Sequence, residues 1–247
     1  NPTDVIMTHE IGGYYDAWGV YAADPLARGP GDEIYFAYRK FDKVIEIVQW
    51  NGNGWNPLTQ VEDSAPIGSA LALEADSAGH LHLAFSYAQS DSVQGVKYGY
   101  FDGNEWIFAP VDEISGGGNI TGFHIKLAVD SNQKAHILYT YKQGDSGALN
   151  YAANPSGSWQ HQTIEPSAAE MFGLSISVGS GDRIHLAYTI GGKFYYTASD
   201  ADFSDPKLLL ENVSAMENIV APLVTDADDR VHYAYVNGSD QKVYLAT

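Results

Sequence analysis

The side chains best suited to do chemistry in this chain are four histidines at nearly regular intervals. They are His82, His136, His185 and His232. In three cases an aspartate stands six residues earlier, at Asp76, Asp130 and Asp226. A histidine beside a carboxylate is an arrangement that proteins use both for metal ligands and for general bases. Which role applies depends on the elements that carry these histidines.

The histidines belong to an internal repeat. Five stretches share one pattern, an alternating run, a turn and a second alternating run, at 23–38, 69–87, 125–141, 174–189 and 221–236. Tyr35 takes the histidine position in the first stretch, and the successive spacings from Tyr35 to His232 are 47, 54, 49 and 47 residues. The 247 residues therefore hold five units, and repeats of this length indicate solenoids or propellers.

Each unit continues with a third run and a hairpin turn. Trp55, Trp106 and Trp159 follow that turn in three units, and Phe203 takes the position in the fourth. Four short strands of period 2, repeated every 40 to 50 residues or so, are typical of a β-propeller blade. We expect an all-β, single-domain, five-bladed β-propeller with four antiparallel strands per blade. The blades would span about 19–63, 68–113, 123–165, 173–213 and 220–247.

The fifth unit has only three strands, since the sequence ends with KVYLAT. Residues 3–10 (TDVIMTHE) have the pattern of a fourth strand and would pair with residues 242–247. This pairing would close the ring and remove the free edges of the first and last blades.

Alternation along the second strand favours a packing role for the histidines. His82 shares one face with Ala84, whereas Leu83 and Phe85 share the other. A small face and a bulky face suit sheets that stack on one another. We therefore expect the histidines at these interfaces, each hydrogen-bonded to a backbone or carboxylate group. A zinc site is disfavoured because the second strands of a propeller point in different radial directions.

The repeated aspartates and tryptophans could each have a structural or a functional role. Asp76, Asp130 and Asp226 begin turns, where aspartate bonds its own backbone, so a turn role is favoured over calcium binding. The tryptophans are expected to staple the outer edge of each blade rather than to form lectin platforms. No cofactor is expected, no metal ligand is assigned, and a structural calcium ion stays open.

Composition excludes several classes of protein. The chain has 13 Lys+Arg, 31 Asp+Glu, a net charge of −18 and no cysteine. Disulfides, thiolate metal sites and a cysteine nucleophile are excluded, and a 45% hydrophobic composition argues against global disorder. The acidity makes nucleic acid an unsuitable partner, and no apolar run approaches the roughly 20 residues that membrane insertion requires.

The repeated pattern D-S-x-G-x-x-H-[LI]-x-[YF], followed by L-x-Y-A and a tryptophan hairpin, resembles the repeats of sialidase-like, BNR-type propellers. These occur in secreted and cell-surface proteins, so the resemblance implies a secreted or extracellular location. Three sequons point the same way, at Asn119, Asn212 and Asn237. The Asp-box Ser-x-Asp-x-Gly-x-x-Trp is absent, so sialidase chemistry is not implied.

Two five-bladed families are also similar to parts of the chain. NGNGW, at 51–55, resembles the turns of tachylectin-type lectins. Asp24-Pro25 resembles the segment that carries a catalytic carboxylate in five-bladed glycoside hydrolases. That chemistry needs a second carboxylate, for which Asp16, Glu74 and Glu170 are candidates, but the Glu-Gly-Pro of those enzymes is missing. The missing residues favour a binding protein over an enzyme.

The candidate ligand site centres on the aromatic loop at 10–21. Tyr14, Tyr15 and Trp18 can stack on the faces of a sugar while Asp16 bonds its hydroxyl groups. The alternative is that these rings plug the central channel.

Other loops of the same face could complete this site. Arg39 and Lys40, expected after the second strand of the first blade, would bind an anionic group of the ligand. His124 lies at the exit of a glycine-rich lid at 113–124. Phe172, beside Glu170, lies in the matching loop of the fourth blade.

We therefore expect a secreted or surface-displayed binding module for carbohydrate, with a glycan or another small polar ligand as its partner. A glycan-active hydrolase and a protein-interaction scaffold are the alternatives, and the oligomeric state is not assigned.

Deleting residues 1–10 should lower the midpoint of thermal unfolding of the whole chain, because the closing strand would be lost. Circular dichroism of the truncated and full-length chains measures this effect. An unchanged unfolding midpoint would contradict closure by residues 3–10.

Overall fold

The computed structural model describes residues 23–90, 93–115, 120–143, 146–154, 157–166, 171–213, 223–240 and 242–247. The chain divides into two compact units, Asn1–Ile120 and Thr121–Thr247, which are described separately. Predictions for residues 3–10, Tyr14, Tyr15, Asp16, Trp18 and Glu170 lie outside the described residues.

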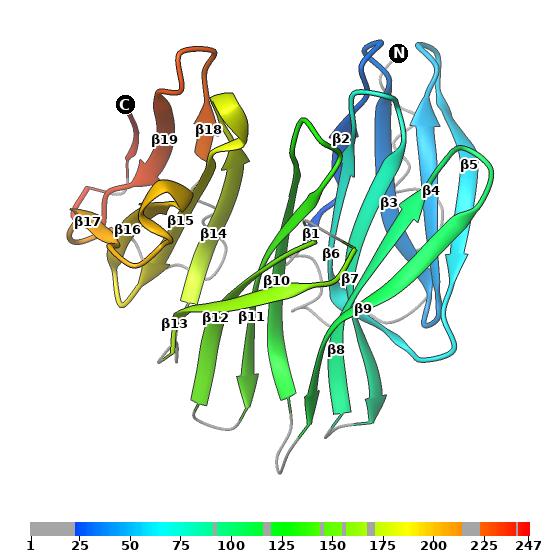
Figure 1. Cartoon of the computed structure of the whole chain (residues 1–247), viewed down its shortest axis with the longest axis horizontal. Helices are drawn as coiled ribbons and strands as arrows, with labels where there is room; N and C mark the ends of the chain where they lie inside the picture. Colours follow the sequence, from blue (N-terminus) through cyan, green and yellow to red (C-terminus); the bar gives the residue numbers. More distant parts are fainter. Residues whose placement is uncertain are drawn as a thin grey trace. The chain divides into compact units, whose positions relative to one another are not determined.

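The first unit contains two antiparallel sheets (Figure 1). One has four strands in chain order, β2 (Leu26–Arg28), β3 (Ile34–Phe41), β4 (Val44–Trp50) and β5 (Trp55–Glu62). The other orders β6 (Ile67–Ala75), β7 (Leu81–Ser90), β8 (Val93–Phe101) and β9 (Trp106–Ser115), and β1 (Ala23–Asp24) runs parallel to β6 at its edge.

The second unit contains three antiparallel sheets. The first orders β10 (Ile120–Val129), β11 (Ala135–Gln143), β12 (Ser146–Ala153) and β13 (Gln160–Glu165). The second orders β14 (Met171–Val178), β15 (Ile184–Ile190), β16 (Lys193–Ala198) and β17 (Lys207–Leu210). The third has β18 (Leu223–Thr225), β19 (Val231–Val236) and β20 (Val243–Ala246).

The prediction of an all-β chain built from four-stranded antiparallel sheets is confirmed. Besides strands, the described residues form two short 3-10 turns, Ser180–Asp182 and Ser199–Ala201. Hydrogen bonds between the described strands do not join the sheets into a closed ring. The described part of the chain has no helix long and apolar enough to cross a membrane.

The core lies between neighbouring sheets, as the alternation predicts. In the first unit Ile45 and Ile47 of β4 pack with Leu83 and Phe85 of β7, and all four are buried. Burying one such side chain stabilises the fold by about 1.5 to 3 kcal/mol.

The β14–β17 sheet packs on both of its faces. Leu186 and Tyr188 contact the β10–β13 sheet, whereas Ala187 faces the β18–β20 sheet. Successive residues of β15 therefore point to opposite neighbours.

At Trp106 the structure supports the prediction that the tryptophans hold the outer edge of each sheet in place. Its ring stacks on Phe101 and Phe108, and its indole N–H donates to the Thr59 hydroxyl of the neighbouring sheet at 3.1 Å. The ring thus joins the outer strands of two sheets and is not a free platform.

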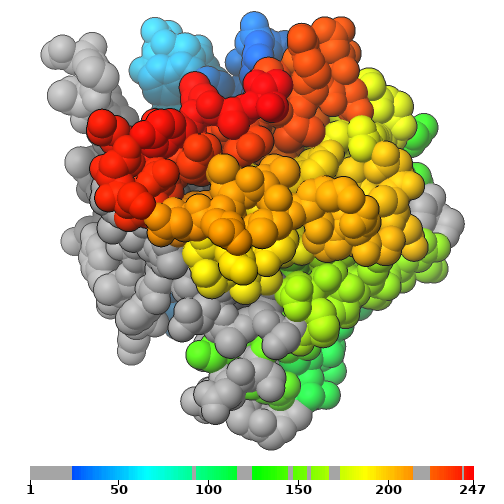
Figure 2. Space-filling model, turned by 90° about the vertical axis from the view of Figure 1, so that its left-hand side faces the viewer, coloured from blue at the N-terminus to red at the C-terminus, as the bar shows by residue number. Residues whose placement is uncertain are grey.

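The last strand of the second unit has an unpaired edge among the described strands. Val243 and Leu245 of β20 are 70% and 85% exposed. Figure 2 shows this strand (red) at the molecular surface. An exposed apolar edge strand is a ready template for another strand.

Candidate functional site

The recurring histidines form buried polar clusters. In the β6–β9 sheet His82 is fully buried, with its Nε2 3.4 Å from Asp76 Oδ2 and its Nδ1 2.6 Å from the Tyr98 hydroxyl. A carboxylate can only accept, so Nε2 carries the proton and Nδ1 accepts from the tyrosine. The cluster thereby fixes one tautomer of the ring.

The same arrangement recurs in the second unit. His136 Nε2 lies 3.3 Å from Asp130 Oδ2, and its Nδ1 lies 2.6 Å from the Tyr151 hydroxyl. His232 Nε2 lies 2.9 Å from Asp226 Oδ2, and the Thr247 hydroxyl takes the tyrosine's place at 3.1 Å. The prediction that these histidines bond carboxylates is confirmed.

The aspartates also hold the turns, as predicted. Asp76 Oδ1 accepts the backbone N–H groups of Ala78 and His80 at 2.8 and 2.9 Å. Asp130 and Asp226 accept the corresponding N–H groups of their own turns. Burial alone would raise the pKa of Asp76, but its hydrogen bonds lower the pKa overall.

These clusters are poor candidates for catalysis or metal binding. Burial lowers the pKa of His82, His136 and His185, against the opposing effect of the neighbouring aspartates. Both ring nitrogens of each histidine already have partners. Across the ranges that the structure describes, no three His, Asp or Glu side chains are grouped to hold a metal ion.

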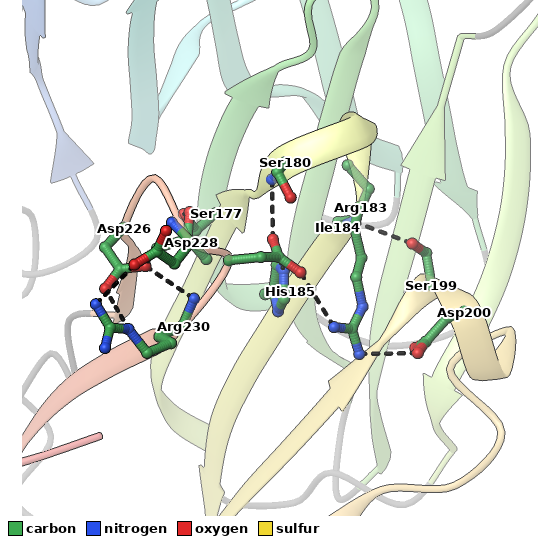
Figure 3. Close-up of polar contacts among 12 residues, drawn as sticks. Ser177, Ser180, Arg183, Ile184, His185, Ser199, Asp200, Asp226, Asp228 and Arg230 are labelled. Atoms are coloured by element: carbon green, nitrogen blue, oxygen red, sulfur yellow. Dashed lines mark hydrogen bonds and ion pairs between the residues drawn. The ribbon is translucent and has the colours of Figure 1, made fainter.

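His185 differs in the source of its carboxylate, which the sequence pattern did not reveal. Its Nδ1 lies 2.8 Å from the Tyr196 hydroxyl, but its Nε2 lies 3.2 Å from Asp229 of the β18–β19 turn. Nearby, Figure 3 shows Arg183 reaching Asp200, and Arg230 reaching Asp226 and Asp228.

Arg39 and Lys40 lie within β3, so the expectation that they follow this strand is wrong. The strand continues to Phe41 because its hairpin with β4 pairs Phe41 with Val44. Arg39 donates to the Ile67 carbonyl at 2.9 Å, and Lys40 donates to Glu46 at 2.7 Å. Both cations therefore have partners within the first unit.

Glu46 is a buried carboxylate that the pattern analysis missed. It is 5% exposed and accepts hydrogen bonds from Lys40, Gln60 and Tyr38. Burial alone would raise the pKa of Glu46, but these bonds lower it, while burial and Glu46 raise the pKa of Tyr38 to about 12. In the sequence this buried carboxylate could have been recognised as the one charged residue within the apolar run VIEIV, at 44–48.

Two residues of the second unit that were predicted to lie in loops, His124 and Phe172, lie in strands, so that placement is wrong. His124 lies in β10 and is half-buried, and burial, with Lys126 nearby, lowers its pKa. Phe172 lies in β14 opposite Thr189, and its side chain is outside the described residues.

Asp24 lies beside another carboxylate in the first unit. Pro25 separates β1 from β2, and β1 pairs with β6, so Asp24 belongs to the edge of the β6–β9 sheet rather than to the β2–β5 sheet. Its register partner is Ala72, and Glu74 is two residues further on the same face of β6. Strand spacing puts the two Cα atoms roughly 8 Å apart.

The buried histidines should make stability fall as the pH drops. Their folded-state pKa values are lowered, so the unfolded chain binds protons first as the pH falls through about 6.5. The free energy of unfolding should therefore decrease from pH 7 towards pH 5, and less steeply in His82→Gln. Urea unfolding at each pH measures this.

His161→Gln is the matched control, since this histidine is exposed on β13. The same pH slope in His82→Gln and His161→Gln would contradict the role assigned to burial.

Comparison with known proteins finds similarity in structure but not in sequence. No protein-family model matches the chain, and no curated protein is significantly similar in sequence. An α-L-arabinanase of Penicillium chrysogenum, complexed with arabinobiose, superposes with a TM-score of 0.65 at 12% identity, over 92% of this chain and 77% of that one.

Two further structures are similar. A Hadza microbial sialidase superposes with a TM-score of 0.60 at 8% identity, over 90% of this chain and 55% of that one. The SapL1 lectin in complex with alpha methyl fucoside superposes with a TM-score of 0.55 at 13% identity, over 90% and 76%. At these identities the similarity shows the fold alone, and that fold matches β-propeller proteins.

Proposed function

We propose that this chain is a secreted or surface-displayed carbohydrate-binding module. The observation that carries the proposal is the class of its structural neighbours, which include proteins solved with arabinobiose and with a fucoside. Its own residues supply suitable chemistry, because Tyr14, Tyr15 and Trp18 offer flat rings and Asp16 offers a carboxylate acceptor within one segment.

The architecture that we propose for this function is a single five-bladed propeller. Each of the five sheets would be one blade, and residues 3–10 would close the ring. Ligand residues would then lie on loops, where they can vary without disturbing the sheets.

The buried histidine clusters argue for a ligand site at other residues of the chain. The ring nitrogens of His82 already have hydrogen-bond partners. Arg39 already donates to the Ile67 carbonyl, and Lys40 already donates to Glu46. We therefore place the main contacts on the aromatic segment rather than on these two cations.

Trp18→Ala should abolish glycan binding while leaving the fold intact. The expected dissociation constants of the wild-type chain are micromolar to millimolar, typical of few contacts at an open site. A glycan array followed by calorimetry on its hits measures this, and circular dichroism checks the fold.

Ile107→Ala is the matched control, because this side chain is 57% exposed on the outer strand β9. An array without hits would overturn the glycan proposal and leave the interaction scaffold as the alternative.

A second candidate function is glycoside hydrolysis, favoured by the position of Asp24 beside Glu74. Paired carboxyl groups that hydrolyse glycosides lie about 5 to 9.5 Å apart. The register of β1 with β6 supports this candidate because it puts Asp24 and Glu74 on adjacent strands, on one face of the same sheet. One would act as an acid and the other as a base or nucleophile.

Under this candidate, Asp24→Asn should reduce release of arabinose, xylose or fructose from aryl glycosides by about a hundredfold or more. Glu74→Gln should do the same, and Glu105→Gln, an exposed carboxylate of the β8–β9 turn, should not. Wild-type protein without activity on all three glycoside classes would exclude this candidate.

A further inference from the structure

The β14–β15 turn lacks the aspartate that its counterparts carry at their first position. Asp76, Asp130 and Asp226 hold that position in three turns, whereas Gly179 holds it here. His185 nevertheless has a carboxylate partner, because Asp229 Oδ1 lies 3.2 Å from its Nε2. That carboxylate comes from the turn of the neighbouring sheet.

Asp229 binds three groups of the β14–β15 turn and strand at once. Its Oδ1 accepts the backbone N–H of Ser180 at 2.8 Å, and its Oδ2 accepts from Arg183 Nη1 at 3.2 Å. With His185 this makes three donors on one carboxylate. Figure 3 shows Ser180, Arg183 and His185 directed towards the same place.

Gly179 is required by space and not by its backbone angles. Its φ of −92° and ψ of −168° are extended values that any residue can adopt. A Cβ at this position would lie 1.9 Å from Asp229 Oδ1 and 2.6 Å from His185 Nε2. The carboxylate of Asp229 therefore fills the volume that an aspartate at position 179 would need.

A second junction in the same unit repeats the contact. Asp182 accepts the backbone N–H of Ser131 at 2.8 Å, the Ser131 hydroxyl at 2.9 Å and Asn132 Nδ2 at 2.8 Å. Asp182 and Asp229 both hold the fourth position of their turns, and Ser131 and Ser180 both hold the second. The geometry is thus a repeated feature of the junctions between sheets.

The fourth position is costly for aspartate, which indicates a compensating gain. Asp182 has a φ of 61° and Asp229 a φ of 63°, in the left-handed region that favours glycine. Charge-assisted hydrogen bonds to backbone N–H groups are strong enough to offset that cost.

The first unit has a junction in which both polar groups are absent. Gly79 holds the fourth position and Pro30 the second, and a Cβ on Gly79 would lie 3.9 Å from Pro30 Cγ. Proline has no N–H to donate, and glycine has no carboxylate to accept it. The two positions therefore match in chemistry at each of these three junctions.

We propose that, within each unit, the second and fourth turn positions form a matched contact that positions a sheet on the preceding one, and that Asp229 supplies to His185 the carboxylate missing at Gly179. Asp229 is thus a positioning residue shared between the β14–β17 and β18–β20 sheets. At these three junctions the partner of the turn is the adjacent turn of the same unit, whatever ligand the protein binds.

The first test is a double-mutant cycle on the full chain. Gly179→Ala should lower the unfolding midpoint by roughly 5 °C, because its methyl group meets a fixed carboxylate. In the Asp229→Gly background the same substitution should lower the midpoint by no more than about half as much, because only the contact with His185 Nε2 remains. Equal losses in both backgrounds would overturn the proposal.

The second test returns the carboxylate to the first position. Asp229→Gly alone should lower the midpoint, and Gly179→Asp with Asp229→Gly should recover at least about half of that loss. A double variant less stable than Asp229→Gly alone would count against the exchange.

Amide exchange provides a local readout that general destabilisation would not imitate. In Asp229→Gly, exchange of the Ser180 N–H should accelerate about tenfold or more while that of Ser131 stays unchanged, and Asp182→Gly should reverse this selectivity. Unchanged Ser180 protection in Asp229→Gly would disprove the contact.

Asp202→Gly is the control for relief of backbone strain. Asp202 has a φ of 49°, and its carboxylate accepts no hydrogen bond from the part of the chain that the structure describes. Its unfolding midpoint should stay the same or rise. A loss equal to that of Asp229→Gly would assign both effects to the backbone.

Discussion

Burial of both faces of a sheet is the constraint on which this structure depends. The β14–β17 sheet has neighbours on both sides, so neither face can be given over to water. Alternating side chains must then fit two different partners, with Ala187 making room on one face while Tyr188 fills space on the other. The two-residue alternation of side chains along β15 therefore follows from packing on both faces of the sheet.

Polar side chains within such interfaces must find partners inside the protein. His82 and His136 do so by bonding a tyrosine hydroxyl with one nitrogen and a turn aspartate with the other. An unpaired buried ring would cost about 1 to 3 kcal/mol. The aspartate serves two purposes, because it also caps the N–H groups of the tight turn.

Much of this arrangement could be predicted from the sequence, since it follows from local spacing. The strand positions, the opposite faces of His82 and Leu83 and the turn role of Asp76 all depend on residues near one another in the chain. The source of the carboxylate for His185 could not be predicted in this way. It depends on the distance between two turns in different sheets, and the sequence shows only that Gly179 stands where three other turns carry an aspartate.

The candidate ligand residues show the same division. Arg39 and Lys40 follow an alternating run, so a strand end was a fair expectation, but the hairpin with β4 extends past them to Phe41. The placement of Asp24 depended on a break at Pro25, after which the chain changes its pairing partner from β6 to β3. Such exchanges between sheets are set by packing at the sheet edges, for which a single sequence has no periodic signal.

The shared carboxylate of Asp229 makes the repeats unequal. Copying or transplanting the segment β14–β17 would carry a histidine without its aspartate, unless the following turn travelled with it. The β14–β17 sheet and the β18–β19 turn therefore depend on each other at this boundary.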